Sequence, residues 1–337
     1  MRNFLIKSCL ALTPRSISHR LAGEFVPVFM LHRLVDSNGE RDGVMIDLLA
    51  QYLEYIRKHR YQPVSLQALF DCINREEPLP ERAVAFTMDD GFADQFEYIS
   101  PVFTQYDVPL TCFVIIDFLE GKLWPWDDQV KYIFNKTGAS NFSVRLPDET
   151  EFESELLQDK SRDSQRRRLL RMLKEQDQSN IYEWLDDLYR AAELDVPGSI
   201  PNEFAPASWE QADRFVQSGH AVAAHTRTHR ILSRLSDAEA YDEIIGSYEF
   251  LKNRLAGSAD TFAYPTGQLS DFGQREMDII KASPISGAVS TVSDALRPGY
   301  PLQAVPRFSL PDNMTDFLQY LSFFEVVKNK IRGIGPT

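Results

Sequence analysis

The sequence predicts an α/β fold in which strands and helices alternate along the chain. Residues 83–92 (AVAFTMDDGF) form an apolar run that ends in two carboxylates and a glycine, a pattern typical of a buried strand followed by a turn. Residues 110–116 (LTCFVII) are continuously apolar, as expected for a parallel strand that is buried on both faces. Helical patterns separate these runs, and this alternation favours an α/β barrel with an insertion.

The other elements follow the same alternation. We expect further strands at residues 26–34, 61–64, 219–224, 260–264 and 287–291. We expect helices at residues 45–59, 66–74, 92–99 (limited by Pro101), 208–216 (with Ser208 as N-cap), 235–255 and 315–334. The predicted organisation is an N-terminal helical segment at 1–25, a barrel at 26–310 with a charged helical insertion at 141–207, and a C-terminal helix within 311–337.

Composition narrows the class of protein. The 337 residues include 43% apolar residues and 22 Phe, enough for a sizeable core, and the net charge of −13 argues against non-specific binding of nucleic acid. Three widely spaced cysteines (Cys9, Cys72 and Cys112) match neither a zinc pattern nor a disulfide framework, which suits a reducing compartment. Lys7 interrupts the short apolar run at the N-terminus, so we expect a cytoplasmic protein with at most weak peripheral contact to the inner membrane.

Asp89 and Asp90 lie at the predicted C-terminal end of the strand in 83–92, which is the catalytic face of an α/β barrel. Two neighbouring acids at that face could divide the work, one holding a metal and the other moving a proton. Taken alone the pair is a weak signal, because the chain contains 49 acidic residues and a solvated loop or a helix N-cap would look the same.

His225 and His229, in AAHTRTHRILSRLS, strengthen the metal interpretation. The chain has six His, and these two are four residues apart, a spacing that would place both rings on one face of a helical turn. Imidazole nitrogens and a carboxylate oxygen are typical ligands of catalytic zinc. Asp90, His225 and His229 are therefore a candidate three-ligand set for a divalent metal.

These motifs resemble those of the polysaccharide deacetylase (NodB-homology) family. TMDDG is similar to the family's TFDDG motif, HTRTH to its H-[ST]-x-x-H motif, and FAYPTG at residues 262–267 to its third motif. The resemblance covers roughly residues 26–310 and implies a distorted (β/α)7-type barrel. It also implies that Asp89 is the base, that Asp90, His225 and His229 bind the metal, zinc by preference, and that the backbone amide of Thr266 stabilises the oxyanion.

The resemblance bears on further residues less directly. MLHRL at residues 30–34 is similar to a motif of the circularly permuted poly-N-acetylglucosamine deacetylase branch, which makes His32 the candidate general acid; a hydrogen-bonded core His is the alternative. Many relatives carry an arginine where this chain has Ala263, and Arg307 could replace it in space or form a surface ion pair.

Four residues remain as candidates for contact with substrate. Tyr264 and Pro265 belong to the third motif, and Trp124 and Trp126 in LWPWDD could either pack in the core or form the wall of a sugar site.

The expected activity is metal-dependent removal of an N-acetyl group from an acetylated amino sugar of a polysaccharide, glycolipid or sugar precursor, with release of acetate. O-deacetylation or deformylation of a lipid-linked sugar would use the same groups. A non-catalytic sugar-binding relative is the alternative of a different class, supported by the missing arginine at Ala263.

Overall fold

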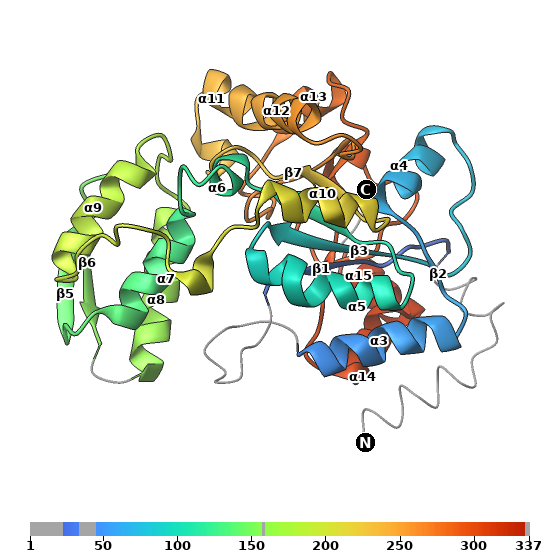
Figure 1. The fold of residues 1–337 in the computed structure, drawn as a ribbon, viewed down its shortest axis with the longest axis horizontal. Helices are drawn as coiled ribbons and strands as arrows, with labels where there is room; N and C mark the ends of the chain where they lie inside the picture. Colours follow the sequence, from blue (N-terminus) through green and yellow to red (C-terminus); the bar gives the residue numbers. More distant parts are fainter. Residues whose placement is uncertain (1–22, 34–44, 157–158, 334–337) are drawn as a thin grey trace.

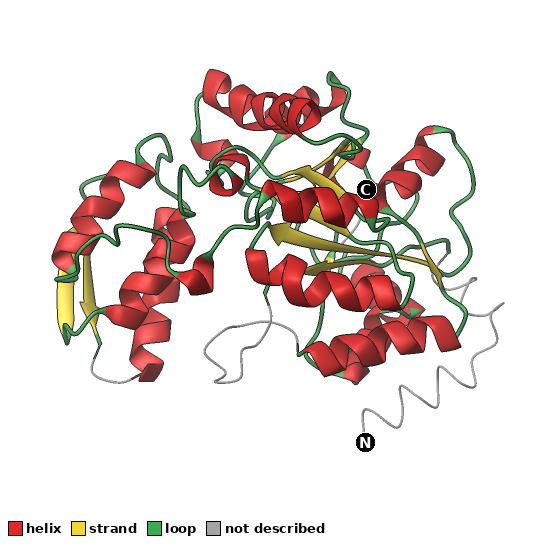
Figure 2. Cartoon of the chain, in the orientation of Figure 1, coloured by secondary structure: helices red, strands yellow, loops and turns green. Residues whose placement is uncertain are grey.

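The computed structural model describes residues 23–33, 45–156 and 159–333. A curled parallel sheet lies at the centre of the larger part and is covered by helices, while a smaller group of helices with a β-hairpin lies to one side (Figures 1 and 2). The predicted N-terminal helical segment falls almost entirely outside the described residues.

The central sheet has the strand order β10-β1-β3-β4-β7-β8-β9, with β2 paired to the beginning of β3, and every one of these pairs is parallel. Its strands are β1 (Val28–Leu31), β2 (Gln62–Pro63), β3 (Ala83–Asp90), β4 (Thr111–Val114), β7 (Ala221–Ala224), β8 (Thr261–Ala263), β9 (Gly287–Val289) and β10 (Phe308–Ser309). Parallel strands all end at the same edge of the sheet, so the acids at the end of β3 and the histidines after β7 share one edge.

The segment from residue 305 to residue 309 closes the sheet into a distorted barrel. Val305 forms a parallel bridge with Val289 of β9, and three residues later Phe308 is in register with Phe29 of β1. The chain thus crosses from the last strand of the sheet to the first, and Arg307 lies between the two contacts. The predicted barrel is confirmed, and this closure determines where Arg307 can reach.

Helices cover the outside of the barrel and alternate with its strands along the chain, as the sequence predicts. They are α3 (Ile46–Lys58), α4 (Leu66–Asn74), η1 (Gln95–Ile99), α5 (Ser100–Gln105), α6 (Ile116–Leu119), η2 (Asn202–Phe204), α10 (Trp209–Gln217), η3 (Leu232–Arg234), α11 (Asp237–Tyr241), η4 (Asp242–Gly246), α12 (Ser247–Arg254), α13 (Gln274–Lys281), η5 (Leu302–Ala304), α14 (Met314–Tyr320) and α15 (Phe323–Ile331). Ser208 caps α10 as predicted, through a capping box with Gln211.

Two helix predictions were wrong in detail. Pro101 does not end its helix: the helix runs without a break from η1, a π-turn, into α5, of which Pro101 is the second residue. The C-terminal region is two helices rather than one, because Ser322 interrupts the helical pattern and caps α15 through its side chain.

Strand β3 buries its large side chains toward the helices and its small ones toward the barrel interior. On β3, Val84, Phe86 and Met88 belong to the core shared with the helices, whereas Ala83 and Ala85 face the inner cluster. Successive side chains of a strand point to opposite faces, so Thr87 and Asp89 follow the alanines toward the interior. The small inner residues leave room for polar side chains at the end of the barrel.

The inserted subdomain has a core of its own and contains a β-hairpin in addition to the predicted helices. It consists of α7 (Trp126–Lys136), an antiparallel hairpin of β5 (Asn141–Arg145) and β6 (Glu151–Glu155), α8 (Asp159–Leu173) and α9 (Ile181–Ala191). The hairpin shows strict alternation of buried and exposed residues, with Phe142, Val144 and Phe152 facing the helices. The subdomain also begins before residue 141, since α7 supplies part of its core.

Within the described residues, no helix is both long and apolar enough to cross a bilayer.

His220 gives a test of the fold through the pH dependence of stability. Burial lowers its pKa to about 4, and its Nε2 lies 2.8 Å from Thr104 Oγ1. The His220 ring is protonated below about pH 6.5, the ordinary pKa of His, in the unfolded chain, but only near pH 4 in the folded protein. The contribution of His220 to the free energy of unfolding is therefore fully present above pH 6.5 and is lost as the pH is lowered toward 4. We expect His220→Asn to flatten this fall, as measured by urea unfolding at several pH values.

The exposed His59 supplies the matched control, since His59→Asn should change the slope less. A slope that is the same in His220→Asn and in the wild type would contradict the assignment.

Candidate metal centre and active site

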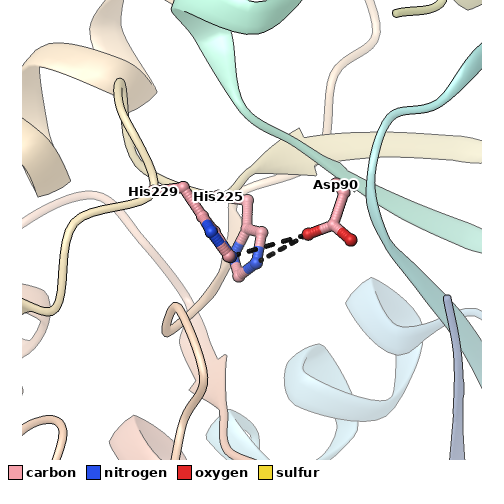
Figure 3. Close-up of side chains that lie close together, drawn as sticks. All are labelled: Asp90, His225 and His229. Carbon is pink, nitrogen blue, oxygen red and sulfur yellow. Dashed lines mark ion pairs between the residues drawn. The ribbon is translucent and has the colours of Figure 1, made fainter. Parts of the chain in front are cut away.

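Asp90, His225 and His229 converge at the carboxyl edge of the sheet. One ligand atom from each lies within 4.8 Å of the others, and Asp90 Oδ1 is 3.6 Å from Nε2 of both histidines. Figure 3 shows the two rings side by side and directed at the Asp90 carboxylate. The structure therefore brings together all three residues of the predicted ligand set.

Local backbone geometry brings these groups together. Asp90 ends β3 with φ 85°, a left-handed value that is unusual for a residue with a side chain, and Gly91 follows with φ 89°. His225 directly follows β7 and its backbone N–H donates to Val114 O on β4. The predicted helical turn for the two histidines is wrong, because residues 225–230 form a loop in which Thr226 (φ 64°) and His229 (φ 58°) are left-handed.

The cluster fits a divalent metal. Nδ1 of His225 lies 2.7 Å from Ala263 O, so this nitrogen carries the hydrogen and the lone pair of Nε2 faces Asp90. Asp90 Oδ1 is buried and has no hydrogen-bond partner among the described residues, which is an unfavourable state for a carboxylate oxygen unless a cation satisfies it. Two imidazole nitrogens with one carboxylate oxygen match the donor set of catalytic zinc.

The two histidines have opposite pKa shifts. Burial lowers the pKa of His225 to about 4, which keeps the ring in its neutral, metal-binding form. Burial also opposes charge on His229, but the carboxylates around it, Asp127 foremost, outweigh burial and raise its pKa to about 9. Asp127 Oδ1 lies 3.3 Å from His229 Nδ1. A metal at Nε2 would take the place of the proton that these carboxylates otherwise favour.

Asp89 lies beside the cluster in a different environment. It is 1% exposed, and both of its oxygens accept from Arg307, at 2.8 Å from Nη1 to Oδ1 and 2.8 Å from Nη2 to Oδ2. Burial alone would raise the pKa of Asp89, but Arg307 and then His32 reverse this effect and lower it to about 2. Asp89 is therefore ionised near neutral pH and held in one orientation.

Arg307 is fully buried and is held by further contacts besides Asp89. Its Nε donates to Ser290 O at 3.0 Å and its Nη1 also donates to Thr87 Oγ1 at 2.9 Å, so the guanidinium is fixed on three sides. The contact with Asp89 is a buried, bidentate one rather than the surface ion pair of the alternative interpretation. The segment that closes the barrel thus places Arg307 in contact with Asp89, a contact that the short side chain of Ala263 cannot make.

His32 lies at the open side of Asp89. Its Nε2 is 3.7 Å from Asp89 Oδ2, and its side chain is 46% exposed, so the ring is neither a core residue nor remote from the acids. Gln95 anchors this region, since its side-chain amide donates to the carbonyls of His32 and Asp89 and its oxygen accepts from the backbone N–H groups of Gly91 and Phe92.

The third motif forms a tight turn near the cluster. Thr266 is left-handed (φ 54°), and its hydroxyl donates to Asp271 Oδ2. Tyr264 is 1% exposed, stacks on Phe272 and donates its hydroxyl to Gln303 O at 2.8 Å. Pro265 is buried as well. Tyr264 and Pro265 are therefore buried beside the turn, and little of their surface is available for contact with a substrate.

The two tryptophans pack in the interior. Trp126 is completely buried in the core of the inserted subdomain, and its Nε1 donates to His229 O at 3.1 Å. Trp124 is 7% exposed and packs on Tyr132 and Phe204. The expectation that Trp126 walls a sugar site is corrected by its burial, and Trp124 has little free ring surface.

Sequence reasoning missed two acids that touch the His225–His229 loop. Glu243 is 1% exposed and accepts hydrogen bonds from the backbone N–H groups of Arg227 (2.8 Å) and Thr228 (3.0 Å). It belongs to η4, a π-turn within a helix. Asp127, in the acidic pair of LWPWDD, lies against His229. The pair at 127–128 resembled the pair at 89–90 only in composition, and no motif marked it.

Comparisons with known proteins identify relatives of this chain. The family model for polysaccharide deacetylase matches residues 76–276, more than half of the chain. A poly-β-1,6-N-acetyl-D-glucosamine N-deacetylase of Escherichia coli (strain K12) is 28% identical over 89 residues, which are 26% of this chain and 13% of the relative. The chain thus matches only a small part of that curated relative.

Solved structures show the same fold. A Streptococcus pyogenes deacetylase, PplD, in complex with acetate has a TM-score of 0.57 at 16% identity, covering 93% of this chain and 99% of that one. IcaB from Ammonifex degensii has a TM-score of 0.57 at 18% identity, covering 90% of this chain and 98% of that one. At these identities the likeness concerns the fold.

The Arg307–Asp89 pair gives a stability prediction. We expect Arg307→Met to lower the free energy of unfolding by about 3–5 kcal/mol near neutral pH, because the carboxylate of Asp89 stays buried without a partner. The double variant Arg307→Met/Asp89→Leu should recover much of this loss, since it removes the orphaned charge. Urea unfolding of the metal-free proteins measures both effects.

The exposed pair of Arg190 and Asp187 on α9 gives the control, because Arg190→Met should cost no more than about 1 kcal/mol. A loss in Arg307→Met as small as that in Arg190→Met would argue that the buried pair is not needed for folding.

Proposed function

The chain belongs to the polysaccharide deacetylase family, and we propose on this basis that it is a metal-dependent hydrolase that removes an N-acetyl group from an acetylated amino sugar. The observation that carries the proposal is the division between two adjacent acids. Asp90 lies in the histidine cluster with an unpartnered buried oxygen, while both oxygens of Asp89 accept from Arg307. One acid is thus free to bind a metal and the other to move a proton.

Asp90, His225 and His229 would hold the ion, and zinc suits this donor set. A divalent ion bound there supplies Lewis acidity, which polarises the amide carbonyl and makes a water more acidic. The remaining chemistry falls to side chains of the chain itself.

Asp89 is the proposed general base. Its carboxylate is ionised and oriented by the Arg307 fork, and each oxygen keeps a further lone pair that can accept the proton of the attacking water. Because Arg307 is itself fixed by Ser290 O and Thr87 Oγ1, the base does not have to be reoriented during the reaction.

His32 is the proposed general acid that protonates the leaving amine. Its ring is close to Asp89 yet nearly half exposed, so it can contact both the site and an entering sugar. The turn at Thr266 would present its backbone N–H to the developing oxyanion, and the hydroxyl contact with Asp271 helps to hold that turn. The products would be acetate and an amino sugar.

The substrate class follows from the family and from the relatives' names. The Escherichia coli relative is named for poly-β-1,6-N-acetyl-D-glucosamine, which makes a β-linked N-acetylglucosamine polymer the first substrate to examine, ahead of glycolipids and sugar precursors. The non-catalytic alternative rested on the missing arginine at Ala263, and the Arg307–Asp89 contact weakens that support.

Metal content is the first prediction of this proposal. Wild-type protein without a tag should hold close to one equivalent of zinc by elemental analysis, and His225→Ala should lose it because the variant removes one of three ligands. The exposed His59, varied to Ala, should leave the zinc content unchanged. A wild-type protein that takes up no metal even after zinc is added would exclude the proposed mechanism.

Asp89→Asn separates metal binding from catalysis. We expect this variant to keep its zinc but to release acetate about 100- to 10,000-fold more slowly from acetylated glucosamine oligomers, because the amide cannot accept the proton. Asp187→Asn, a change at an exposed aspartate on α9, should leave the rate unchanged. Zinc-loaded wild type that releases no acetate from any acetylated amino sugar would favour the sugar-binding alternative.

A further inference from the structure

We propose that the inserted subdomain positions the metal ligand His229, with Asp127 of α7 as the residue that orients its imidazole ring. The inference rests on the metal site of the proposed function and adds to it a positioning residue from outside the barrel. Its support is geometric and comes from contacts at Thr228, His229 and Ile231.

The first contact is at the ring itself. His229 directs Nε2 toward Asp90 Oδ1 at 3.6 Å, and its other nitrogen, Nδ1, lies 3.3 Å from Asp127 Oδ1. Both Nδ1 and this Asp127 oxygen are buried, and neither has a hydrogen-bond partner elsewhere in the described part of the chain. A ring whose hydrogen is on Nδ1 places a donor 3.3 Å from this carboxylate oxygen, within ion-pair distance.

The second set of contacts holds the loop backbone. Trp126, the neighbour of Asp127, donates its indole N–H to His229 O at 3.1 Å from a fully buried position. Tyr182 of α9 donates its hydroxyl to Thr228 O at 2.6 Å. Ile231, two residues after His229, is buried within the core of the inserted subdomain. The loop that carries His229 is therefore packed into the subdomain as well as onto the barrel.

The two metal-binding histidines are consequently oriented by different parts of the protein. His225 donates from Nδ1 to Ala263 O, a backbone group of β8 in the barrel. His229 has a side-chain carboxylate from the inserted subdomain in the equivalent place. A carboxylate on the far nitrogen of a ligating imidazole fixes its tautomer and raises its basicity as a ligand, and loss of such a partner typically weakens metal affinity 10- to 100-fold.

Zinc affinity of the full chain tests the inference. We expect Asp127→Ala to raise the zinc dissociation constant about 10- to 100-fold, measured by competition with a chromophoric chelator. Asp127→Asn should have a smaller effect, because its amide oxygen can still accept from Nδ1–H. Asp187→Asn, at an exposed aspartate of the same subdomain, should bind zinc as tightly as the wild type.

A merely structural role is separated by two further readouts. The melting temperature of the metal-free protein would fall in a variant that only loosens the subdomain, whereas an orienting role changes the visible spectrum of the cobalt-substituted protein because the ligand field at His229 changes. Tyr182→Phe, which removes one hydrogen bond to the loop without touching the ring, should weaken zinc binding less than Asp127→Ala.

The outcomes distinguish this inference from the proposed function. Unchanged zinc affinity and an unchanged cobalt spectrum in Asp127→Ala would overturn the role of Asp127 while leaving the metal site in place. A wild-type protein that binds no zinc would overturn the metal site and this inference together. Weaker zinc binding in Asp127→Ala, partial rescue in Asp127→Asn and an altered cobalt spectrum would support it.

Discussion

The buried pair of Arg307 and Asp89 is the constraint on which the site depends. An ionised carboxylate that is 1% exposed is stable only with a partner of opposite charge and well-made hydrogen bonds, and Arg307 supplies both. Arg307 can do so because the segment around it crosses from β9 to β1 when the barrel closes. Barrel closure and the protonation state of the proposed base are thus linked through one side chain.

Adjacent acids can have separate roles because the strand ends at the second of them, Asp90. Along a strand, successive side chains point to opposite faces, and Asp89 follows Ala83, Ala85 and Thr87 toward the interior where Arg307 lies. Asp90 is the last residue of β3, and its left-handed backbone (φ 85°) turns its carboxylate toward His225 and His229. Unusual backbone angles at such positions are common where function requires a particular side-chain direction.

Several features that depend on residues close together in the sequence were predicted correctly. The strand before Asp89, the cap at Ser208 and the three residues that cluster at the carboxyl edge were all predicted, because apolar periodicity and short motifs report on neighbouring residues. Features that depend on distant parts of the chain were harder to predict. The bidentate contact of Arg307 spans 218 residues and needs the closed barrel, and the contact of Asp127 with His229 needs a subdomain whose hairpin was not predicted.

The spacing of the histidines illustrates why a correct motif can carry a wrong geometry. Four residues separate His225 from His229 both in a helical turn and in the observed loop, but the left-handed Thr226 and His229 allow the loop to be held from two sides. Glu243 of the barrel helices binds the backbone N–H groups of Arg227 and Thr228, while Trp126 and Tyr182 of the inserted subdomain bind the carbonyls of His229 and Thr228. A helical turn would use those same N–H and carbonyl groups internally. The loop leaves them available, and so the two histidines can be positioned jointly by the barrel and the subdomain inserted into it.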